Sequence, residues 1–404
     1  MSQAIAMTGV GCVLASGVGE ERLWQAARDG VSGIVPLRAR HFHSRRISAF
    51  GHVSEADHQA CRQQVAPNLQ RYCPPAVLWG VDAVRQALQQ AGLEPNQEGL
   101  RFGLYCCQGG YSHPSLDAYA ELLHECRGEL GLDLRKLSRR VLQERALDPF
   151  LVLQSLSNGL LGVVSLAFRL QTECNAFMQG VAGNQAALRE ACAALLSYRI
   201  DAAIVVGAGS ELDALGLAAL VQAGAISANG SDSFRPFDQD GNGAVAGEGA
   251  AALILRRAED VPGPQTCLVG LSAHAEFEQL ALPEVAPDLL LSSARALPEA
   301  DRCLSRTLAR TGAALITNIQ PVTGLLSGAP SLVDLILARC ALQAQCVPPI
   351  IGLQRPVEPD LPFVQGQSRA ARLQGCSILN RDDNGFSACY QLERRDTGRA
   401  TQHR

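Results

Sequence analysis

Charged and aromatic side chains are scarce in this 404-residue chain. Asp, Glu, Lys and Arg together make up 18% of the residues and Phe, Trp and Tyr make up 5%, whereas 47% are hydrophobic and 38 residues are glycine. The formal net charge is −4 at pH 7. A chain without a positive excess offers no basic field to nucleic acid or to an anionic membrane surface, so we expect proteins and small molecules as its partners.

Long apolar runs and cysteine motifs are also lacking. No run approaches the roughly 20 apolar residues that a membrane-spanning helix needs. The fourteen cysteines form no Cys-x-x-Cys pair and no Cys/His cluster with zinc spacing, and the N-terminal residues do not have the pattern of a signal segment. These absences predict a reduced, cytoplasmic protein without a membrane span, a metal or another cofactor, whose cysteines are mostly buried small apolar residues.

Two ligand-binding motifs are present only in part. Gly9-x-Gly11 lacks the third glycine of a dinucleotide-binding turn, and no acidic residue ends a second strand at the spacing that such a site needs. Residues 238–243 match the first half of a calcium-binding EF-hand loop, but its twelfth position, which must supply a bidentate carboxylate, is Gly249. The sequence therefore favours neither a nucleotide site nor a calcium site.

Residues 170–200 predict a strand, a tight turn and a helix. The first part mixes apolar and polar residues over a strand's length, residues 180–184 form the turn, and the stretch from Gln185 onward is rich in alanine and leucine at helical spacing. Free backbone N–H groups at the start of a helix would stabilise the anion of a nucleophile placed at this turn. No nucleophile stands there, because Cys174 lies in the predicted strand and Cys192 inside the predicted helix.

This stretch resembles the nucleophile turn of the β-ketoacyl synthases, whose strand ends in Ala-Cys-(Ser/Thr)-Ser-Gly before a long helix. Matching the last glycine of that motif to Gly183 without gaps places the family's cysteine on Gly180. Trp24, the Arg-Pro-Phe-Asp to Gly-Glu-Gly turn at 235–249 and the Val-Pro-Pro at 347–349 follow the family's order. The resemblance covers roughly residues 4–394 and implies an α/β, thiolase-like fold with two similar halves in a layered α-β-α-β-α arrangement.

The resemblance also implies a division of the chain. Pro262-Gly263-Pro264 marks a plausible boundary, because these residues interrupt regular structure. We expect an N-terminal ketosynthase-like half over residues 1–260, a C-terminal half over 265–394 and a polar tail over 395–404. Residues 202–211 form an apolar run that predicts a parallel strand buried on both faces.

The resemblance implies that the family's catalytic side chains are missing. The two histidine motifs align with residues 288–298 and 323–330, which places Ser293 and Leu325 at the histidines and Gln320 at the usual lysine. The phenylalanine loop that gates the family's cysteine is replaced by a stretch containing Asp382, Asp383 and Asn384. Because condensation needs the thiolate and both imidazoles, we expect no catalytic residue for condensation in this chain.

Other residues are assigned to the acyl tunnel and the subunit interface by resemblance alone. In the family, the residues after the Gly-Gly turn at 109–110 reach across the interface and line the tunnel, which implies that Tyr111, Pro114 and Ala118 face the growing chain. Ordinary interface packing is the alternative for these three. The family also includes chain-length factors, which are ketosynthase-like subunits that do not condense acyl chains, and many of these carry glutamine at the vacated cysteine position. In this chain, Gln179 immediately precedes Gly180.

The interpretation that unites these observations is a chain-length factor of a type II polyketide or aryl-polyene system. Such a subunit forms a heterodimer with an active β-ketoacyl synthase, is served by an acyl carrier protein, and sets the length of the growing chain. Two alternatives stay open. One is an acyltransferase or thioesterase that uses Cys174 or Ser293 in a rebuilt pocket, for which the sequence offers no base, and the other is a homodimeric scaffold that binds carrier protein.

Overall fold

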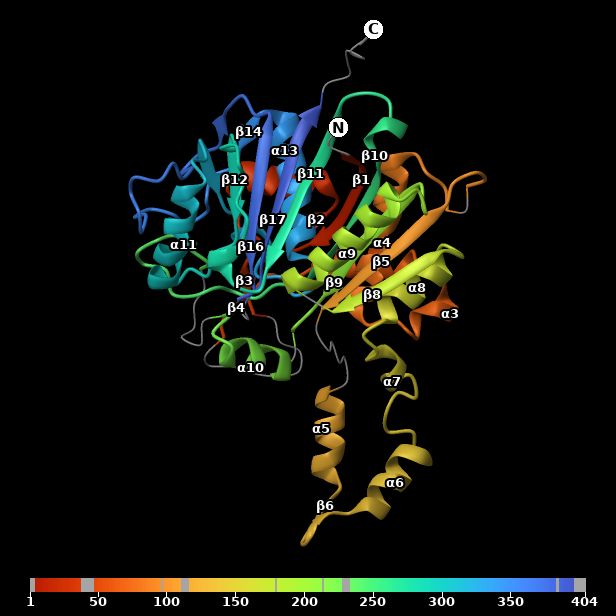
Figure 1. Cartoon of the computed structure of the whole chain (residues 1–404). Coiled ribbons are helices and arrows are strands. Elements are labelled where there is room, and N and C mark those ends of the chain that lie inside the picture. Colours follow the sequence, from red (N-terminus) through yellow and green to blue (C-terminus); the bar gives the residue numbers. More distant parts are fainter. Residues whose placement is uncertain are drawn as a thin grey trace.

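The structure is a computed structural model that describes residues 4–37, 47–95, 97–109, 116–178, 180–212, 214–226, 233–382 and 385–395. A single 11-stranded sheet runs through the body of these residues (Figure 1). Its strands are β1 (Ile5–Leu14), β2 (Gly17–Val18), β5 (Phe102–Gly109), β8 (Glu173–Met178), β9 (Ala202–Gly209), β10 (Gly249–Arg257), β11 (Gln265–His274), β12 (Leu289–Ser292), β13 (Leu315–Thr317), β16 (Gly375–Arg381) and β17 (Ser387–Arg395).

The remaining strands form short two-stranded ribbons and the helices surround the sheet. The ribbons are β3 (Val35–Pro36) with β4 (Ala49–Phe50), β6 (Arg127–Gly128) with β7 (Gly131–Leu132), and β14 (Cys346–Val347) with β15 (Arg369–Ala370). The helices are α1 (Glu20–Arg28), α2 (Glu55–Gln63), α3 (Pro67–Gln70), α4 (Pro75–Ala91), α5 (Leu116–Glu125), α6 (Leu134–Leu142), α7 (Leu151–Gln154), α8 (Gly159–Ala167), α9 (Gly180–Leu196), α10 (Ala214–Gln222), α11 (Pro298–Arg310), α12 (Gln320–Thr323) and α13 (Pro330–Ala344).

Ten strands of the sheet form two five-stranded groups joined at a narrow point, and the short strand β2 pairs with β1 beside this path. One group has the order β1-β10-β9-β5-β8 and the other has the order β13-β12-β16-β17-β11. They meet only where Ile5 and Ala6 of β1 pair with Leu268 and Cys267 of β11. Because the contact is so short, each group keeps its own twist and its own pair of faces for helices to cover.

Helices cover both groups in layers, which confirms the predicted thiolase-like fold. One core cluster joins α9 and α13 to strands of both groups, so these two helices lie between them. A second cluster packs α4 and α8 on the other face of the β1-β10-β9-β5-β8 group. A third packs α11 against the other face of the second group. The fully buried run of β9 pairs parallel with β5, as the sequence predicts, and antiparallel with β10 on its other side.

Helix α9 begins earlier than the sequence predicts. The expected turn over residues 180–184 is wrong, because Gly180 is already the first residue of the helix. Glycine makes this abrupt entry possible. Gly180 has a φ of +84°, and a Cβ on Gly183 would lie 1.6 Å from the carbonyl oxygen of Met178. Strand β8 and helix α9 are therefore joined across residue 179 alone, which lies outside the described residues.

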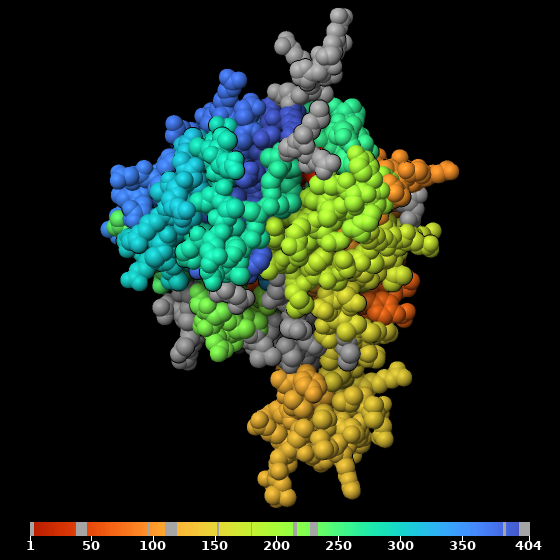
Figure 2. Space-filling view, in the orientation of Figure 1, coloured from red at the N-terminus to blue at the C-terminus, as the bar shows by residue number. Residues whose placement is uncertain are grey.

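Helices α5 and α6 and the β6–β7 ribbon form an arm that projects from the body, with α7 at its base (Figures 1 and 2). Leu122 and Cys126 are buried inside the arm, whereas Leu130, Leu134 and Leu142 are exposed. The arm therefore holds only a small core of its own and presents apolar side chains outward.

Several predictions fall outside the described residues or differ in detail. His274 is the last residue of β11, and its Nδ1 accepts a hydrogen bond from the N–H of Glu276 at 3.0 Å. Strand β17 extends to Arg395, and residues 396–404 lie outside the described part. The division into halves at residues 262–264 stays a prediction. Among the described residues, no helix is both long and apolar enough to cross a membrane.

Candidate functional site

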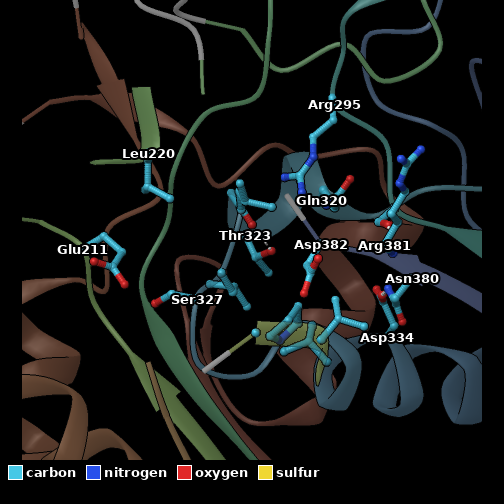
Figure 3. Close-up of a pocket in the computed structure, with 18 of the residues that line it drawn as sticks. Glu211, Leu220, Arg295, Gln320, Thr323, Ser327, Asp334, Asn380, Arg381 and Asp382 are labelled. Carbon is cyan, nitrogen blue, oxygen red and sulfur yellow. Dashed lines mark hydrogen bonds between the residues drawn. The ribbon is translucent and has the colours of Figure 1, made fainter. Parts of the chain in front are cut away.

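A cavity of about 290 Å³ lies at the starts of helices α9 and α13 (Figure 3). It receives residues from the start of α9, from α10, from the segment after β12, from α12 and α13 with their connection, and from the end of β16. Its lining includes Gly180, Ser293, Gln320, Leu325 and Asp382. Five positions that the sequence analysis singled out, from four separate segments, are thus brought to one space.

Gly180 leaves room in the cavity but offers no reactive group. A Cβ at this position would have no atom within 4 Å, apart from its chain neighbours and its own helix. The backbone N–H of Gly180 donates to the carbonyl oxygen of Ser327 at 2.8 Å. The first amide of α9, which could stabilise an anion at this turn, is therefore already satisfied from within the chain.

Leu325 is held in place by its backbone. Its N–H donates to the carbonyl of Val245 at 2.7 Å, and its carbonyl accepts from the N–H of Gly247 at 2.9 Å. Gly324, with a φ of +76°, lets the chain pass against the carbonyl of Ala246. The connection between α12 and α13 is thus fixed to the turn before β10, and it places a hydrocarbon side chain in the cavity.

Gln320 and Ser293 are engaged in local hydrogen bonds. Gln320 Oε1 accepts from the N–H of Ala294 at 2.8 Å and from Asn318 Nδ2 at 2.9 Å. Ser293 Oγ accepts from the N–H of Arg381 at 3.0 Å. These contacts stabilise the loop after β12. No imidazole or amine base accompanies them, since no histidine or lysine is among the described residues that line the cavity, and no hydrogen bond joins Ser293 Oγ to the carboxylates of Asp334 or Asp382 among the contacts of the described residues.

Asp382 closes a short turn at the edge of the cavity. Its N–H donates to the carbonyl of Phe386 at 2.9 Å, and its Oδ1 accepts from the N–H of Phe386 at 3.0 Å. The other two residues of the altered gate loop, Asp383 and Asn384, lie outside the described residues. The carboxylate of Asp382 points into the space that Figure 3 shows.

The sequence analysis missed a buried acid in this cavity. Asp334 on α13 is 7% exposed and its Oδ2 accepts from Asn380 Nδ2 at 2.6 Å. Burial raises the pKa of the Asp334 carboxyl to about 7, and the hydrogen bond from Asn380 opposes this rise. A single acid inside the apolar stretch 332–338 was the signal available in the sequence.

A second buried acid positions the loop that carries Ser293. Asp301 on α11 accepts hydrogen bonds from the N–H groups of Phe237 at 2.8 Å and Arg295 at 2.9 Å. Burial raises the pKa of Asp301 to about 6, although these backbone donors favour its ionised form. The sequence analysis did not identify Asp301 or Arg295, and Arg295 lines the cavity.

The partial calcium motif has a structural role. The carboxylate of Asp238 accepts from the backbone N–H groups of Asp240, Gln354 and Arg355 at 2.8, 2.6 and 2.8 Å. Asp240 forms an ion pair with Arg355. These contacts tie the loop before β10 to residues 354–355. No group of three or more potential metal ligands is found in the part of the chain that the structure describes.

The remaining predicted residues do not meet at this cavity or lie outside the described part. Cys174 is exposed on β8 and is not among the cavity's lining residues. Tyr111, Pro114 and Gln179 lie outside the described residues, and Ala118 is placed only as part of α5. Their assignment to a tunnel or an interface therefore stays a prediction.

The chain belongs to the β-ketoacyl synthase family, because the family description "Beta-ketoacyl synthase, N-terminal domain" matches residues 2–261. Among characterised relatives, the tetracenomycin polyketide synthase ketoacyl synthase beta subunit of Streptomyces glaucescens is 25% identical over 96% of this chain and 98% of its own length. The 3-oxoacyl-acyl-carrier-protein synthase 2 of Vibrio cholerae is 25% identical over 88% of this chain and 89% of its own.

Solved structures share the fold. A β-ketoacyl synthase from Burkholderia phymatum superposes with a TM-score of 0.78 at 18% identity, over 97% of this chain and all of that one. The ishigamide ketosynthase/chain length factor superposes with a TM-score of 0.77 at 19% identity, over 98% of this chain and all of that one. At these identities the likeness concerns the fold alone.

Proposed function

We propose that this protein is a non-condensing ketosynthase-like subunit that forms a heterodimer with an active β-ketoacyl synthase. In this role it sets the length of a polyketide or polyene chain built on an acyl carrier protein in the cytoplasm. The proposal agrees with its similarity to a polyketide synthase beta subunit and to the fold of a ketosynthase/chain length factor.

The observation that carries the proposal is the composition of the cavity. Condensation by a ketosynthase needs a thiolate to hold the acyl chain and two imidazoles to stabilise the enolate. The cavity holds Gly180, Ser293 and Leu325 at the aligned positions, and the N–H of Gly180 donates to Ser327. Among its described residues, a pocket with this lining has neither a thiol nor an imidazole for the reaction.

Exposed apolar side chains support the pairing with a second subunit. Strand β8 is the free edge of the sheet, and Met178 at its end is 55% exposed. Exposed apolar residues continue along α7, α8 and the arm, at Leu130, Leu132, Leu134, Leu142, Leu153, Leu156 and Leu166. An open sheet edge, together with these exposed apolar side chains, favours association with another protein.

Co-expression with a ketosynthase encoded by the same organism tests the proposal. The tag is placed on the ketosynthase only, and the purified material is assayed for elongation of malonyl carrier protein with and without this chain. We expect a one-to-one complex whose product length depends on this chain. Elongation should survive Cys174→Ala and Ser293→Ala in this chain, because neither residue acts in the reaction.

Two results would contradict the proposal. If this chain purifies alone as a stable homodimer that binds carrier protein, the scaffold alternative takes its place. If the chain alone transfers or hydrolyses acyl groups and loses this activity in Cys174→Ala or Ser293→Ala, it is an enzyme with a rebuilt pocket.

A further inference from the structure

One end of the cavity presents hydrogen-bond acceptors from α13 and β16. Asp334 and Asn380 both line the cavity, and they are 7% and 1% exposed. The amide of Asn380 donates to Asp334, whereas Asn380 Oδ1 is buried without a hydrogen-bond partner. Buried acceptors of this kind favour a ligand that brings N–H or O–H groups to them.

The charges around this end favour a cationic donor. Asp382 lies close to Asp334 and Asn380 in Figure 3. The guanidinium of Arg381 lies 5.2 Å from the ring centroid of Phe277 and points away from Asp334. Of the other charged residues of the lining, Glu211 lies at the far left of this view, and Arg295 enters from above, next to Gln320. The Asp334 end is therefore locally acidic.

The rest of the lining is hydrocarbon. Ile319, Leu326 and Val333 face the same space, and Leu325 occupies the position of the family's second histidine. The N–H of Gly180 is bonded to Ser327, so the start of α9 has one donor fewer for an anion. The cavity is thus acidic at one end and lined by hydrocarbon elsewhere. A ligand with one cationic end and a short apolar chain fits this lining better than a ligand with an anionic end does.

We propose that this cavity binds a small aliphatic primary amine. Its ammonium group donates hydrogen bonds to the Asp334 carboxylate and to Asn380 Oδ1, and its alkyl chain packs against Ile319, Leu326 and Val333. The proposal goes beyond the pairing and chain-length role described above and does not depend on it.

Binding should depend on pH through Asp334. Burial raises the pKa of this carboxyl to about 7, so the carboxylate fraction is about tenfold larger at pH 8 than at pH 6. An alkylammonium ion stays protonated over this range. The ion should therefore bind about tenfold more tightly at pH 8 than at pH 6.

Isothermal titration of the full-length protein tests this inference, using n-butylammonium chloride, butan-1-ol and sodium butyrate at matched ionic strength. If the chain is obtained only in a complex with a ketosynthase, the same complex carrying Asp334→Asn is the reference. We expect saturable binding of n-butylammonium at pH 8, about tenfold weaker binding at pH 6, and no comparable binding of the alcohol or the carboxylate.

Variants assign the contacts. Asp334→Asn keeps the shape of the side chain and should abolish n-butylammonium binding, and Asn380→Ala should weaken it. Asp360→Asn, which changes an exposed acid outside the cavity, should bind like the wild type. Equal binding of butan-1-ol, tighter binding of butyrate, or no binding of any probe would overturn the proposal. None of these measurements involves condensation, so a negative result would overturn the amine-binding proposal without contradicting the proposed function.

Discussion

At the scale of single residues, Gly180 leaves the start of α9 without a nucleophilic side chain. It stands where the aligned family motif has its cysteine, its φ is +84°, and its N–H is bonded to Ser327. We expect Gly180→Cys to place a thiol in open space and still give no condensation, because Ser293 and Leu325 cannot transfer protons as imidazoles do. The measurement is elongation of malonyl carrier protein by the isolated variant. Elongation above the level of the wild-type chain would show that the thiol alone was missing.

Asp334 makes a second prediction at this scale. Its pKa is raised by burial from 3.8 to about 7, so between these values the folded protein binds more protons than the unfolded chain. The free energy of unfolding therefore falls as the pH rises from about 4 to about 7. The contribution of this one group is up to roughly 4 kcal/mol.

Asp334→Asn should flatten this dependence, as measured by urea unfolding at a series of pH values. Asp301, whose pKa is raised to about 6, acts in the same direction and remains in the variant, so part of the slope should persist. An unchanged slope in Asp334→Asn would mean that the Asp334 carboxyl is ionised in the folded protein well below pH 7.

At the scale of elements, the joint between β8 and α9 depends on a glycine without room for a methyl group. A Cβ on Gly183 would lie 1.6 Å from the carbonyl oxygen of Met178, whereas a Cβ on Gly180 meets open space. We expect Gly183→Ala to destabilise the protein by more than about 4 kcal/mol, and Gly180→Ala by about 1–2 kcal/mol from its left-handed backbone alone. Urea unfolding of both variants checks this. Equal losses would contradict the close approach.

Strand β8 also carries a prediction about association. If this edge pairs with a second subunit, Met178→Glu should weaken the complex at least about tenfold, because it buries a charge without a partner. Val285→Glu is the matched control, since Val285 is 81% exposed in the connection between β11 and β12. Binding to the immobilised ketosynthase measures both. Equal affinities of the two variants would place the interface elsewhere.

At the scale of the whole molecule, the arm presents apolar side chains to solvent. It projects from the body and exposes Leu130, Leu134 and Leu142 (Figure 2). Lys136, on α6 within this arm, is the only lysine in the sequence. An amine-directed crosslinker should therefore join the arm to the partner subunit in the proposed complex. Mass spectrometry identifies the crosslink. Lys136→Arg should remove it. A crosslink that persists in this variant would come from the N-terminal amine and not from the arm.

The sequence by itself was enough to predict the fold, because its motifs resemble those of a known family and follow that family's order. The buried run of β9 was also visible as an apolar stretch of strand length, whereas the start of α9 was placed too late, because the sequence was interpreted as a turn over residues 180–184. The sequence also predicts that Gly180, Ser293 and Leu325 stand where the family has its thiol and imidazoles, and none of these three side chains can act as a thiol or an imidazole.

Only the tertiary structure decided which residues share the cavity and what pKa the acid among them has. Asp334 and Asn380 lie on α13 and β16, far apart in the sequence, and burial together with one hydrogen bond sets the pKa of that acid. The capture of the Gly180 N–H by Ser327 likewise joins two distant segments. Such contacts depend on distance and desolvation in three dimensions, and neither quantity is encoded in the spacing of residues along the chain.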